Sequence, residues 1–153
     1  SSAPAAPPMN ADVSNAGWLN PMCGVPSERD LEVTKTIYQV AQEEGANEKV
    51  LLSAFEAGWV ESHMNNLDCG DRDSLGVFQQ RPSQGWCDNP DDCLDVEYAT
   101  KSYLEVAIPN EEANPDYTAG ELAQSVQRSA YPDRYDEAED KATEMIEEAE
   151  QES

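Results

Sequence analysis

Residues 59–86 read WVESHMNNLDCGDRDSLGVFQQRPSQGW. The segment begins as the end of an apolar helix and continues into a loop rich in Asp, Gly, Arg and Gln. In the loop only Leu75, Val77 and Phe78 cluster as apolar residues, so its pattern fits neither a helix face nor a plain buried strand. A polar loop of this length needs a chemical explanation, and the glutamate at the end of the helix offers one.

That glutamate, Glu61, continues an apolar row on a helix predicted over about residues 48–62. The residues at i, i+4, i+7 and i+11 of the row are Val50, Ala54, Ala57 and Glu61. Apolar surroundings disfavour the charged form of a carboxyl group and raise its pKa, and a general acid at neutral pH requires such a shift. The alternative is that Glu61 turns into water at the helix end, or pairs with Arg72 or Arg81.

The loop after Glu61 supplies further carboxylates. Asp68, Asp71 and Asp73 all lie within reach of Glu61 in the sequence. A carboxylic acid with a raised pKa facing an ionised carboxylate is the arrangement of glycoside hydrolysis, with the two groups about 6.5–9.5 Å apart in inverting enzymes. Glu61 is therefore the candidate acid, and the loop aspartates are candidate bases.

The chain contains four cysteines, Cys23, Cys69, Cys87 and Cys93. No CxxC pair is present and there is one histidine, so we expect no metal site. An even set in a chain of this size indicates two disulfides and an oxidising compartment. Of the three possible pairings we favour Cys87–Cys93, which closes a tight acidic loop, and Cys23–Cys69, which ties the N-terminal segment to the polar loop.

Length and charge limit the possible partners. The 153 residues suffice for one domain with a single core. The net charge is −23, from 9 Lys+Arg against 32 Asp+Glu, which argues against nucleic acid or an anionic membrane as a partner. No run approaches the ~18 apolar residues of a membrane span. We expect a soluble monomer without a cofactor, although this charge is unfavourable for binding an anionic polymer.

Composition divides the chain into an arm and a domain. Residues 1–22 are expected to form an extended Ala/Pro-rich arm, and residues 23–153 a catalytic domain. The start SSAPAAPPMN has no initiator Met, which predicts a processed N-terminus and a secreted, extracellular protein. Apolar spacing predicts a mainly α fold with about five helices. The one extended piece, Ser74–Gln80, is expected in a small β-hairpin.

Capping residues and helix breakers predict the helix boundaries. The two predicted capping boxes are Ser27–Asp30 and Thr118–Glu121. The helix after the first box should end at Gly45. Another helix is predicted over residues 92–107, stopped by Pro109. The last helix should carry Pro132 in its first turn.

Three motifs carry a resemblance to a known group of enzymes. They are Glu61-Ser62 at a helix end, Ser74–Gln79 in the loop, and the sequence SAYPD at residues 129–133. The combination of WVESHMNN and GDRDSLGVFQQRPSQGW resembles the lysozyme-like domains of bacterial and phage cell-wall enzymes, within the wider group of goose-type lysozymes and lytic transglycosylases. The resemblance covers roughly residues 28–150 and implies a lysozyme-like, α-rich fold.

The resemblance also implies roles for individual residues. Glu61 matches the catalytic acid of the group, and Asp71 lies in a GDR sequence similar to one in which an Asp helps to position water. Where goose-type enzymes often carry another Asp just past the Gln, this chain has Arg81, which leaves Asp71 or Asp73 as the candidate base. Tyr131 matches a tyrosine near the sugar at the point of cleavage.

The polar loop also offers groups that can bind a sugar. Ser74, Gln79 and Gln80 supply the donors and acceptors that hydroxyl and N-acetyl groups need. Trp86 can stack on a sugar face, or it can plug the space between loop and core. His63 is expected to be structural or to lie at the rim, because one imidazole alone marks no site.

The resulting hypothesis is a secreted muramidase that hydrolyses the β-1,4 bond between N-acetylmuramic acid and N-acetylglucosamine in peptidoglycan, with Glu61 as the acid. Three alternatives remain open. A lytic transglycosylase would give anhydro products, a chitin-directed hydrolase would act on a neutral N-acetylated polysaccharide, and a non-catalytic module would bind cell-wall sugar without cleaving it. Gln127 and Arg128 either line the cleft or belong to a helix surface.

Overall fold

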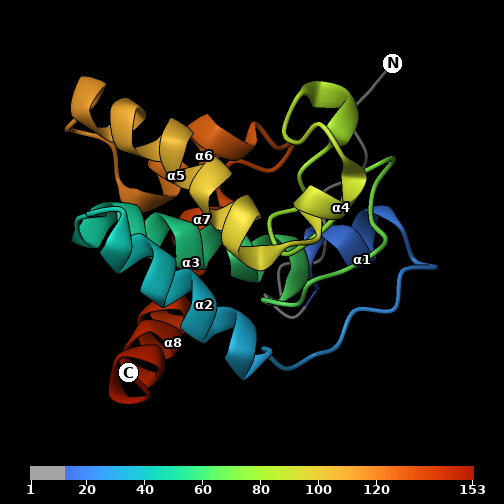
Figure 1. Cartoon of the computed structure of the whole chain (residues 1–153), viewed down its shortest axis with the longest axis horizontal. Helices are drawn as coiled ribbons and strands as arrows, with labels where there is room; N and C mark the ends of the chain where they lie inside the picture. Colours follow the sequence, from blue (N-terminus) through green and yellow to red (C-terminus); the bar gives the residue numbers. More distant parts are fainter. Residues whose placement is uncertain (1–12) are drawn as a thin grey trace.

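Helix α3, Glu48–Ser62, occupies the centre of the structure, a computed structural model that describes residues 13–153 (Figure 1). Its N-terminus is capped by Asn47, whose side chain accepts a hydrogen bond from the amide of Val50 at 2.9 Å. Nearly all of its residues from Val50 onward are buried. The helix predicted over 48–62 is therefore confirmed, and Glu61 lies in its last turn.

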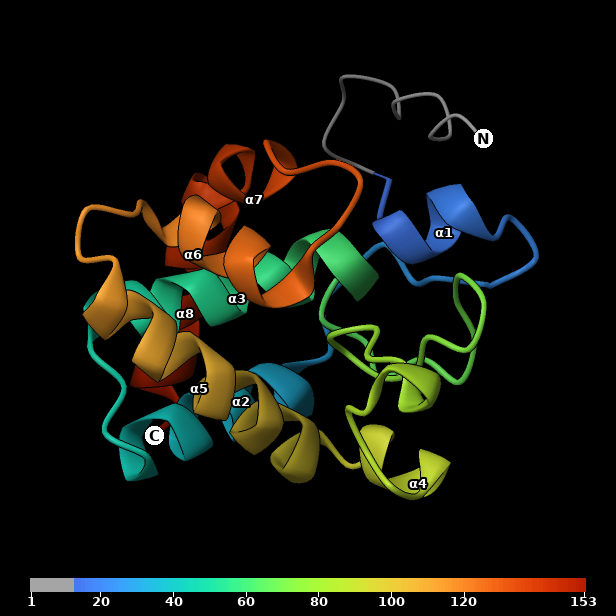
Figure 2. The ribbon, with the colours of Figure 1, turned by 90° about the horizontal axis from the view of Figure 1, so that it is seen from above.

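The described residues contain eight α-helices and one short 3₁₀ helix. Besides α3 they are α1 (Asn15–Leu19), α2 (Leu31–Glu43), η1 (Pro82–Gln84), α4 (Pro90–Cys93), α5 (Val96–Ala113), α6 (Ala119–Gln127), α7 (Arg134–Glu137) and α8 (Glu139–Gln151). The longer helices pack around α3, while α1, α4 and the polar loop lie together at one end of the molecule (Figures 1 and 2). The mainly α class is confirmed, and the helices beyond the expected five are the short ones.

Two predicted helix boundaries are corrected by the structure, the start of α2 and the end of α5. Helix α2 is capped by Asp30, which accepts from the amide of Glu32, so Ser27 forms no capping box with it. Pro109 lies inside α5 and does not end it. The buried face of α5, which includes Tyr103, outweighs the local cost of a proline on the exposed side.

The C-terminal segment forms two helices, α7 and α8, with a break at Ala138, where one long helix was predicted. Pro132 precedes the first of them and lies outside it. The capping box before α6 is confirmed: Thr118 accepts from the amide of Glu121, and the Glu121 carboxylate accepts from the amide of Thr118.

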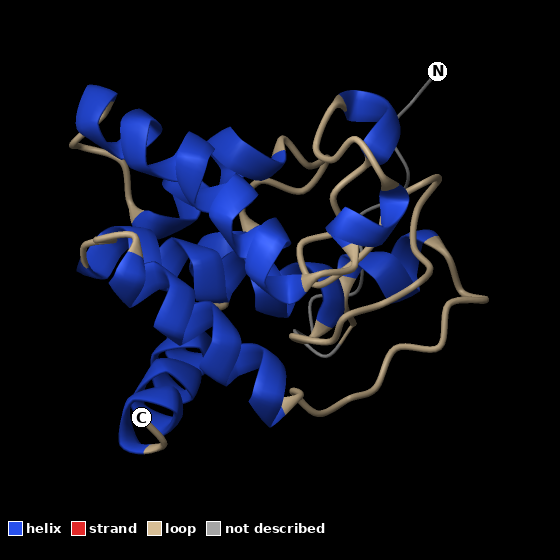
Figure 3. Cartoon of the chain, viewed as in Figure 1, coloured by secondary structure: helices blue, strands red, loops and turns tan. Residues whose placement is uncertain are grey.

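The polar loop contains one antiparallel bridge, between Leu75 and Gln80, whose two backbone hydrogen bonds are each 3.0 Å long. No strand forms within residues 13–153, so the expected hairpin is reduced to this pair (Figure 3). The turn between the two residues buries Val77 in the core. The hydroxyl of Ser62 donates to the carbonyl of Val77 at 2.6 Å, which fixes the turn to the end of α3. The serine of the Glu-Ser pair therefore has a structural function.

Both predicted disulfides, Cys23–Cys69 and Cys87–Cys93, are present. The first joins the segment after α1 to the start of the polar loop, where the side chain of Asn20 also donates to the carbonyl of Gly70 at 2.9 Å. The second closes the loop that contains α4. The two bonds therefore hold α1 and α4 against the same polar loop.

Removing the first disulfide is expected to cost more stability than removing the second. Its cysteines are 46 residues apart, against 6 for the other pair. Chain entropy then predicts a loss of about 4 kcal/mol in the free energy of unfolding for Cys23→Ser/Cys69→Ser, and of about 2 kcal/mol for Cys87→Ser/Cys93→Ser. Urea denaturation of the two double variants measures both values, and the reverse order would contradict this explanation.

The expected extended arm is wrong for the part that the structure describes. Residues 13–22 contain α1, which Ser14 caps by accepting from the amide of Gly17 at 3.1 Å. Asn15 and Ala16 of this helix are buried. Residues 1–12 lie outside the described part of the chain.

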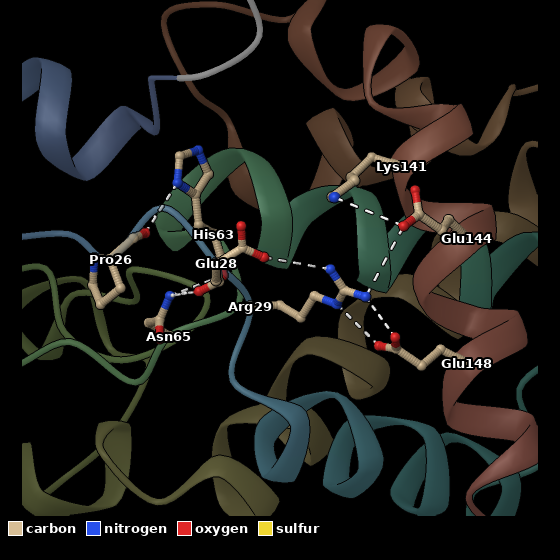
Figure 4. Close-up of polar contacts among 8 residues, drawn as sticks. All are labelled: Pro26, Glu28, Arg29, His63, Asn65, Lys141, Glu144 and Glu148. Carbon is tan, nitrogen blue, oxygen red and sulfur yellow. Dashed lines mark hydrogen bonds and ion pairs between the residues drawn. The ribbon is translucent and has the colours of Figure 1, made fainter.

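Arg29 connects the segment before α2 to the C-terminal helix (Figure 4). Its guanidinium donates through Nε to the Glu148 carboxylate of α8 at 2.9 Å and through a second nitrogen to the other oxygen, with Glu28 and Glu144 nearby. In the same view His63 lies against the carbonyl of Pro26, 3.2 Å from Nδ1. These contacts fix the segment before α2 to helix α8 and to the residue that caps the C-terminus of α3.

Candidate active site

A cavity of about 670 Å³ opens beside the last turn of α3, and we call it the Glu61 cavity. Its walls come from three parts of the chain: α1, the polar loop over residues 71–81, and residues 127–131 at the end of α6. Glu61 lines the cavity although its side chain is largely buried, with 6% of the residue exposed. Glu61, which ends the apolar row on α3, is therefore the side chain at which the three walls meet.

Three donors hold the Glu61 carboxyl group. The amide of Asn15 donates to Oε1 at 3.2 Å. The amide of Gln127 and the hydroxyl of Tyr135 both donate to Oε2, at 3.0 and 2.6 Å. Oε2 therefore receives two hydrogen bonds and Oε1 receives one longer bond, so Oε1 keeps more capacity for a proton.

Burial raises the pKa of Glu61. The hydrogen bonds from Tyr135, Gln127 and Asn15 oppose this shift, and so does the positive charge of Arg134, but burial dominates. The carboxyl group is therefore inclined to keep its proton, while the same neighbours can stabilise the carboxylate once the proton is gone. Both properties are required of a general acid.

The donors are themselves held in place. Arg134 donates to the side-chain oxygen of Asn15 at 2.6 Å and also to the carbonyl of Val13. Gln127 donates a second bond, of 2.8 Å, to the carbonyl of Phe78 in the polar loop. Tyr135 is fully buried. Contacts of this kind fix the orientation of the groups that touch Glu61.

The sequence did not indicate Asn15, Arg134 or Tyr135 as site residues. Asn15 lies in the segment expected to be an extended arm, and Arg134 had no assigned role. Tyr135 lies in the segment predicted as the last helix. A general rule could have identified it, because a buried tyrosine hydroxyl usually finds a hydrogen-bond partner.

The structure separates the two aspartates that were candidate bases. Asp71 lines the Glu61 cavity. Asp73 does not, because its Oδ1 accepts from Nε of Arg81 at 2.6 Å and its Oδ2 accepts from the amide of Ser83 at 2.9 Å. The hydrogen bonds from Arg81 and Ser83 hold the pKa of Asp73 well below its usual range. Asp73 therefore stabilises the loop as an ion pair, and Asp71 is the candidate base that lines the same cavity as Glu61.

Three of the predicted sugar-binding residues lie together in the Glu61 cavity: Ser74, Gln79 and Tyr131. Gln79 has its amide fixed by the carbonyls of Cys69 and Gly76, at 3.2 and 3.0 Å. The expected substrate contact of Gln80 is corrected. The residue is 2% exposed and its amide donates to the carbonyl of Ala99 at 3.0 Å, so it joins the loop to α5.

Trp86 lines a second cavity, of about 480 Å³, which we call the Trp86 cavity. The residues that line both cavities are Gln79, Arg81, Gln127 and Arg128. Trp86 is also packed against the core, which agrees with a plug between loop and core. Its stacking on a sugar face stays a prediction. Gln127 and Arg128 belong to the walls of these cavities as well as to the end of α6.

His63 lies outside the residues that line either cavity. It is buried, and its ring stacks on Trp59 with centroids 4.3 Å apart. Its backbone is in the left-handed region, with φ 52°, at the C-terminal cap of α3. His63 is therefore a structural residue of the turn after the helix.

A second carboxyl group of α3, that of Glu56, is fully buried and differs from Glu61 in its surroundings. Within the described part of the chain neither oxygen of Glu56 has a hydrogen-bond partner, and the residue lines neither cavity. Burial, followed by the charges of Asp136 and Glu139, raises its pKa to about 8. Glu56 is therefore a buried acid without access to a ligand.

Among residues 13–153, no cluster of His, Cys, Asp or Glu could hold a metal ion, and no helix is long and apolar enough to cross a membrane. No protein-family model matches the chain, and no curated protein matches it either. The assignment of a function therefore depends on the residues of the Glu61 cavity.

Proposed function

We propose that this protein is a secreted muramidase with a lysozyme-like fold. The bridge between Leu75 and Gln80 would correspond to the β-hairpin of that fold. The observation that carries the proposal is Glu61, a buried carboxyl group with a raised pKa that lines a cavity able to admit a sugar. Two disulfides support an extracellular location. Trp18 and Tyr131 line the cavity with aromatic rings that suit sugar faces.

In the proposed reaction Glu61 donates the proton on Oε1 to the oxygen of the β-1,4 bond between N-acetylmuramic acid and N-acetylglucosamine. As the bond breaks, the carbon left behind acquires oxocarbenium character. The carboxylate that remains on Glu61 keeps its bonds from Asn15, Gln127 and Tyr135, and Arg134 lies close enough to lower its pKa. These groups are in place before the proton leaves, so little reorganisation accompanies the transfer.

Asp71 is the proposed base. It would orient a water molecule and accept a proton from it while the water attacks the sugar carbon, which gives hydrolysis with inversion. Polar groups of the same cavity, such as Ser74 and Gln79, are placed to bind hydroxyl and N-acetyl groups of the substrate.

A lytic transglycosylase is the second candidate function. The residues that line the Glu61 cavity include only one other carboxylate, Asp71, because Asp73 is bound to Arg81 and Ser83. With a single candidate base, attack by the 6-hydroxyl of muramic acid competes with attack by water. The product would then carry an anhydro end.

Mass spectrometry of products from purified peptidoglycan tests the function and separates the two outcomes. We expect disaccharide products with hydrated reducing ends, and anhydro ends would establish the transglycosylase instead. No glycan cleavage, with binding of the polymer, would show a non-catalytic sugar-binding module and contradict the proposal.

Asp71→Asn is expected to lower the rate of hydrolysis by about 100-fold or more, since general bases contribute about 10²–10⁴. Asp73→Asn is the matched control, and a change of no more than a few-fold is expected because its carboxylate is outside the cavity. Release of reducing ends gives both rates. Equal losses in the two variants would show that Asp71 acts through loop stability and not as a base.

A further inference from the structure

The Glu61 cavity collects arginines in a chain that is otherwise strongly acidic. The chain has 9 Lys+Arg against 32 Asp+Glu. Three arginines line this cavity, Arg72, Arg81 and Arg128, together with only two acidic residues, Glu61 and Asp71. Basic groups gathered in a concave site raise the local potential there, against the negative charge of the rest of the molecule.

Two of these arginines have no ion-pair partner among residues 13–153. Arg81 is neutralised by Asp73 at 2.6 Å. Arg72 and Arg128, by contrast, form no ion pair and donate no side-chain hydrogen bond within the described residues, and both are exposed. They come from different walls of the cavity, Arg72 from the polar loop and Arg128 from the end of α6.

The backbone at both positions is strained for an arginine. Arg72 has φ 55° and Arg128 has φ 50°, in the left-handed region where glycine is favoured. Arg128 is the C-terminal cap of α6, a position that glycine commonly occupies near helix ends. An L-residue with a Cβ costs roughly 1 kcal/mol in this conformation. Two charged residues at such positions on one cavity point to a function for their side chains.

We propose that Arg72 and Arg128 clamp a carboxylate of the bound glycan from two sides, so that the site selects carboxylate-bearing sugar chains over neutral ones. The inference rests on the proposed function and specifies its substrate class. Planar guanidinium groups bind carboxylates through paired, charge-assisted hydrogen bonds. A chitin chain has N-acetyl groups but no carboxylate, so it gains nothing from the pair. In peptidoglycan the carboxylate belongs to the peptide where one is attached, and to the lactyl group of muramic acid where the peptide is absent, because the link to the peptide turns the lactyl carboxyl group into an amide.

Binding to a protein that cannot turn over its ligand is the direct test. Soluble glycan fragments of equal length would be titrated into Glu61→Gln protein by calorimetry, in four forms: with peptides intact, with peptides removed, with all carboxyl groups amidated, and as neutral chitooligosaccharide. Tight binding of the first form without the second assigns the carboxylate to the peptide. Tight binding of the second form without the first assigns it to the lactyl group, whose carboxylate is free only where the peptide has been removed. Tight binding of both shows that the clamp accepts either carboxylate. Equal affinity for all four forms would overturn the clamp.

Glycine substitutions separate the clamp from a structural role. Arg72→Gly/Arg128→Gly is expected to raise the Kd for the carboxylate-bearing glycan about tenfold, as expected for the loss of about 1.4 kcal/mol, with no change for the amidated form. Because glycine relieves both backbone positions, the melting temperature should stay level or rise. Lys35→Gln, on α2 and outside both cavities, is the control for charge removal alone. Unchanged affinity in the double variant would overturn the proposal.

Failure of the clamp and failure of the proposed function give different results. If the protein cleaves peptidoglycan but binds amidated and carboxylate-bearing glycan equally well, the clamp is wrong and the proposed muramidase activity stands. Carboxylate-dependent binding without any cleavage supports the clamp and overturns the enzymatic function.

Discussion

Glu61→Gln is expected to reduce cleavage of peptidoglycan by about 10³-fold, within the 10²–10⁴ contributed by a general acid. Glutamine keeps the size of the side chain and an oxygen that can accept from Gln127 and Tyr135, and of the three hydrogen bonds it loses only the longest, from Asn15. What it lacks is the proton that the leaving oxygen requires. Release of reducing ends, measured at several protein concentrations, gives the rate of cleavage for the variant and for the parent protein.

Glu48→Gln is the matched control, because Glu48 is exposed at the start of the same helix. It should retain full turnover. The melting temperature of Glu61→Gln should equal or exceed that of the parent protein, since burial disfavours the charged form of Glu61. A general acid contributes about 10²-fold or more. If Glu61→Gln kept more than about a tenth of the parent turnover, the reduction would be too small for an acid and the proposed role of Glu61 would be wrong.

Glu56 carries the second large expected effect, which is on stability. Its pKa is about 8 in the folded protein, against 4.5 for an ordinary exposed glutamate. A raised pKa means that the folded state holds the proton more tightly, so this stabilisation is complete below about pH 4.5 and is lost as pH rises towards 8. Near pH 8 the free energy of unfolding is lower than at acid pH by an amount on the order of 4 kcal/mol.

Glu56→Gln should therefore unfold with a weaker pH dependence than the parent protein. Urea denaturation at pH 5 and pH 8 measures the difference for both chains, and Glu48→Gln is again the control. The charged groups that act on Glu56 are Asp136 and Glu139, and they remain in every variant, so the comparison isolates one carboxyl group. Glu56→Met offers an apolar replacement of similar length if the glutamine variant is poorly folded. Identical pH slopes in the parent and both variants would contradict a buried protonated Glu56.

The parts of the fold that sequence predicted are those in which local chemistry and tertiary packing agree. Asn47 provides a strong cap, and the apolar row that ends at Glu61 is unbroken, so α3 and its acid could be identified. The pairing Cys23–Cys69 followed from the need to anchor a long polar loop. Pro109 misled the prediction because a breaker rule describes a helix alone, whereas α5 is held by its buried face.

The site was predictable only in part, because its second half depends on contacts between distant segments. Asn15 lies in a helix of five residues that no periodic pattern reveals, and it reaches Glu61 only because α1 is tied down elsewhere. Gln79 and Gln80 are adjacent and chemically identical, yet one lines the cavity and the other donates to Ala99. Which of the two faces a ligand depends on the geometry of the turn, and composition carries no information about it.

The bond between Cys23 and Cys69 has a consequence for when the site becomes complete. It holds the segment that brings Asn15 to Glu61 and that forms one wall of the cavity. A newly made chain with both thiols still reduced would hold that wall through non-covalent contacts alone, such as those of Asn15 and Asn20, so the acid would be more open to water and less inclined to keep its proton. Completion of the site would then be coupled to oxidation of these two thiols.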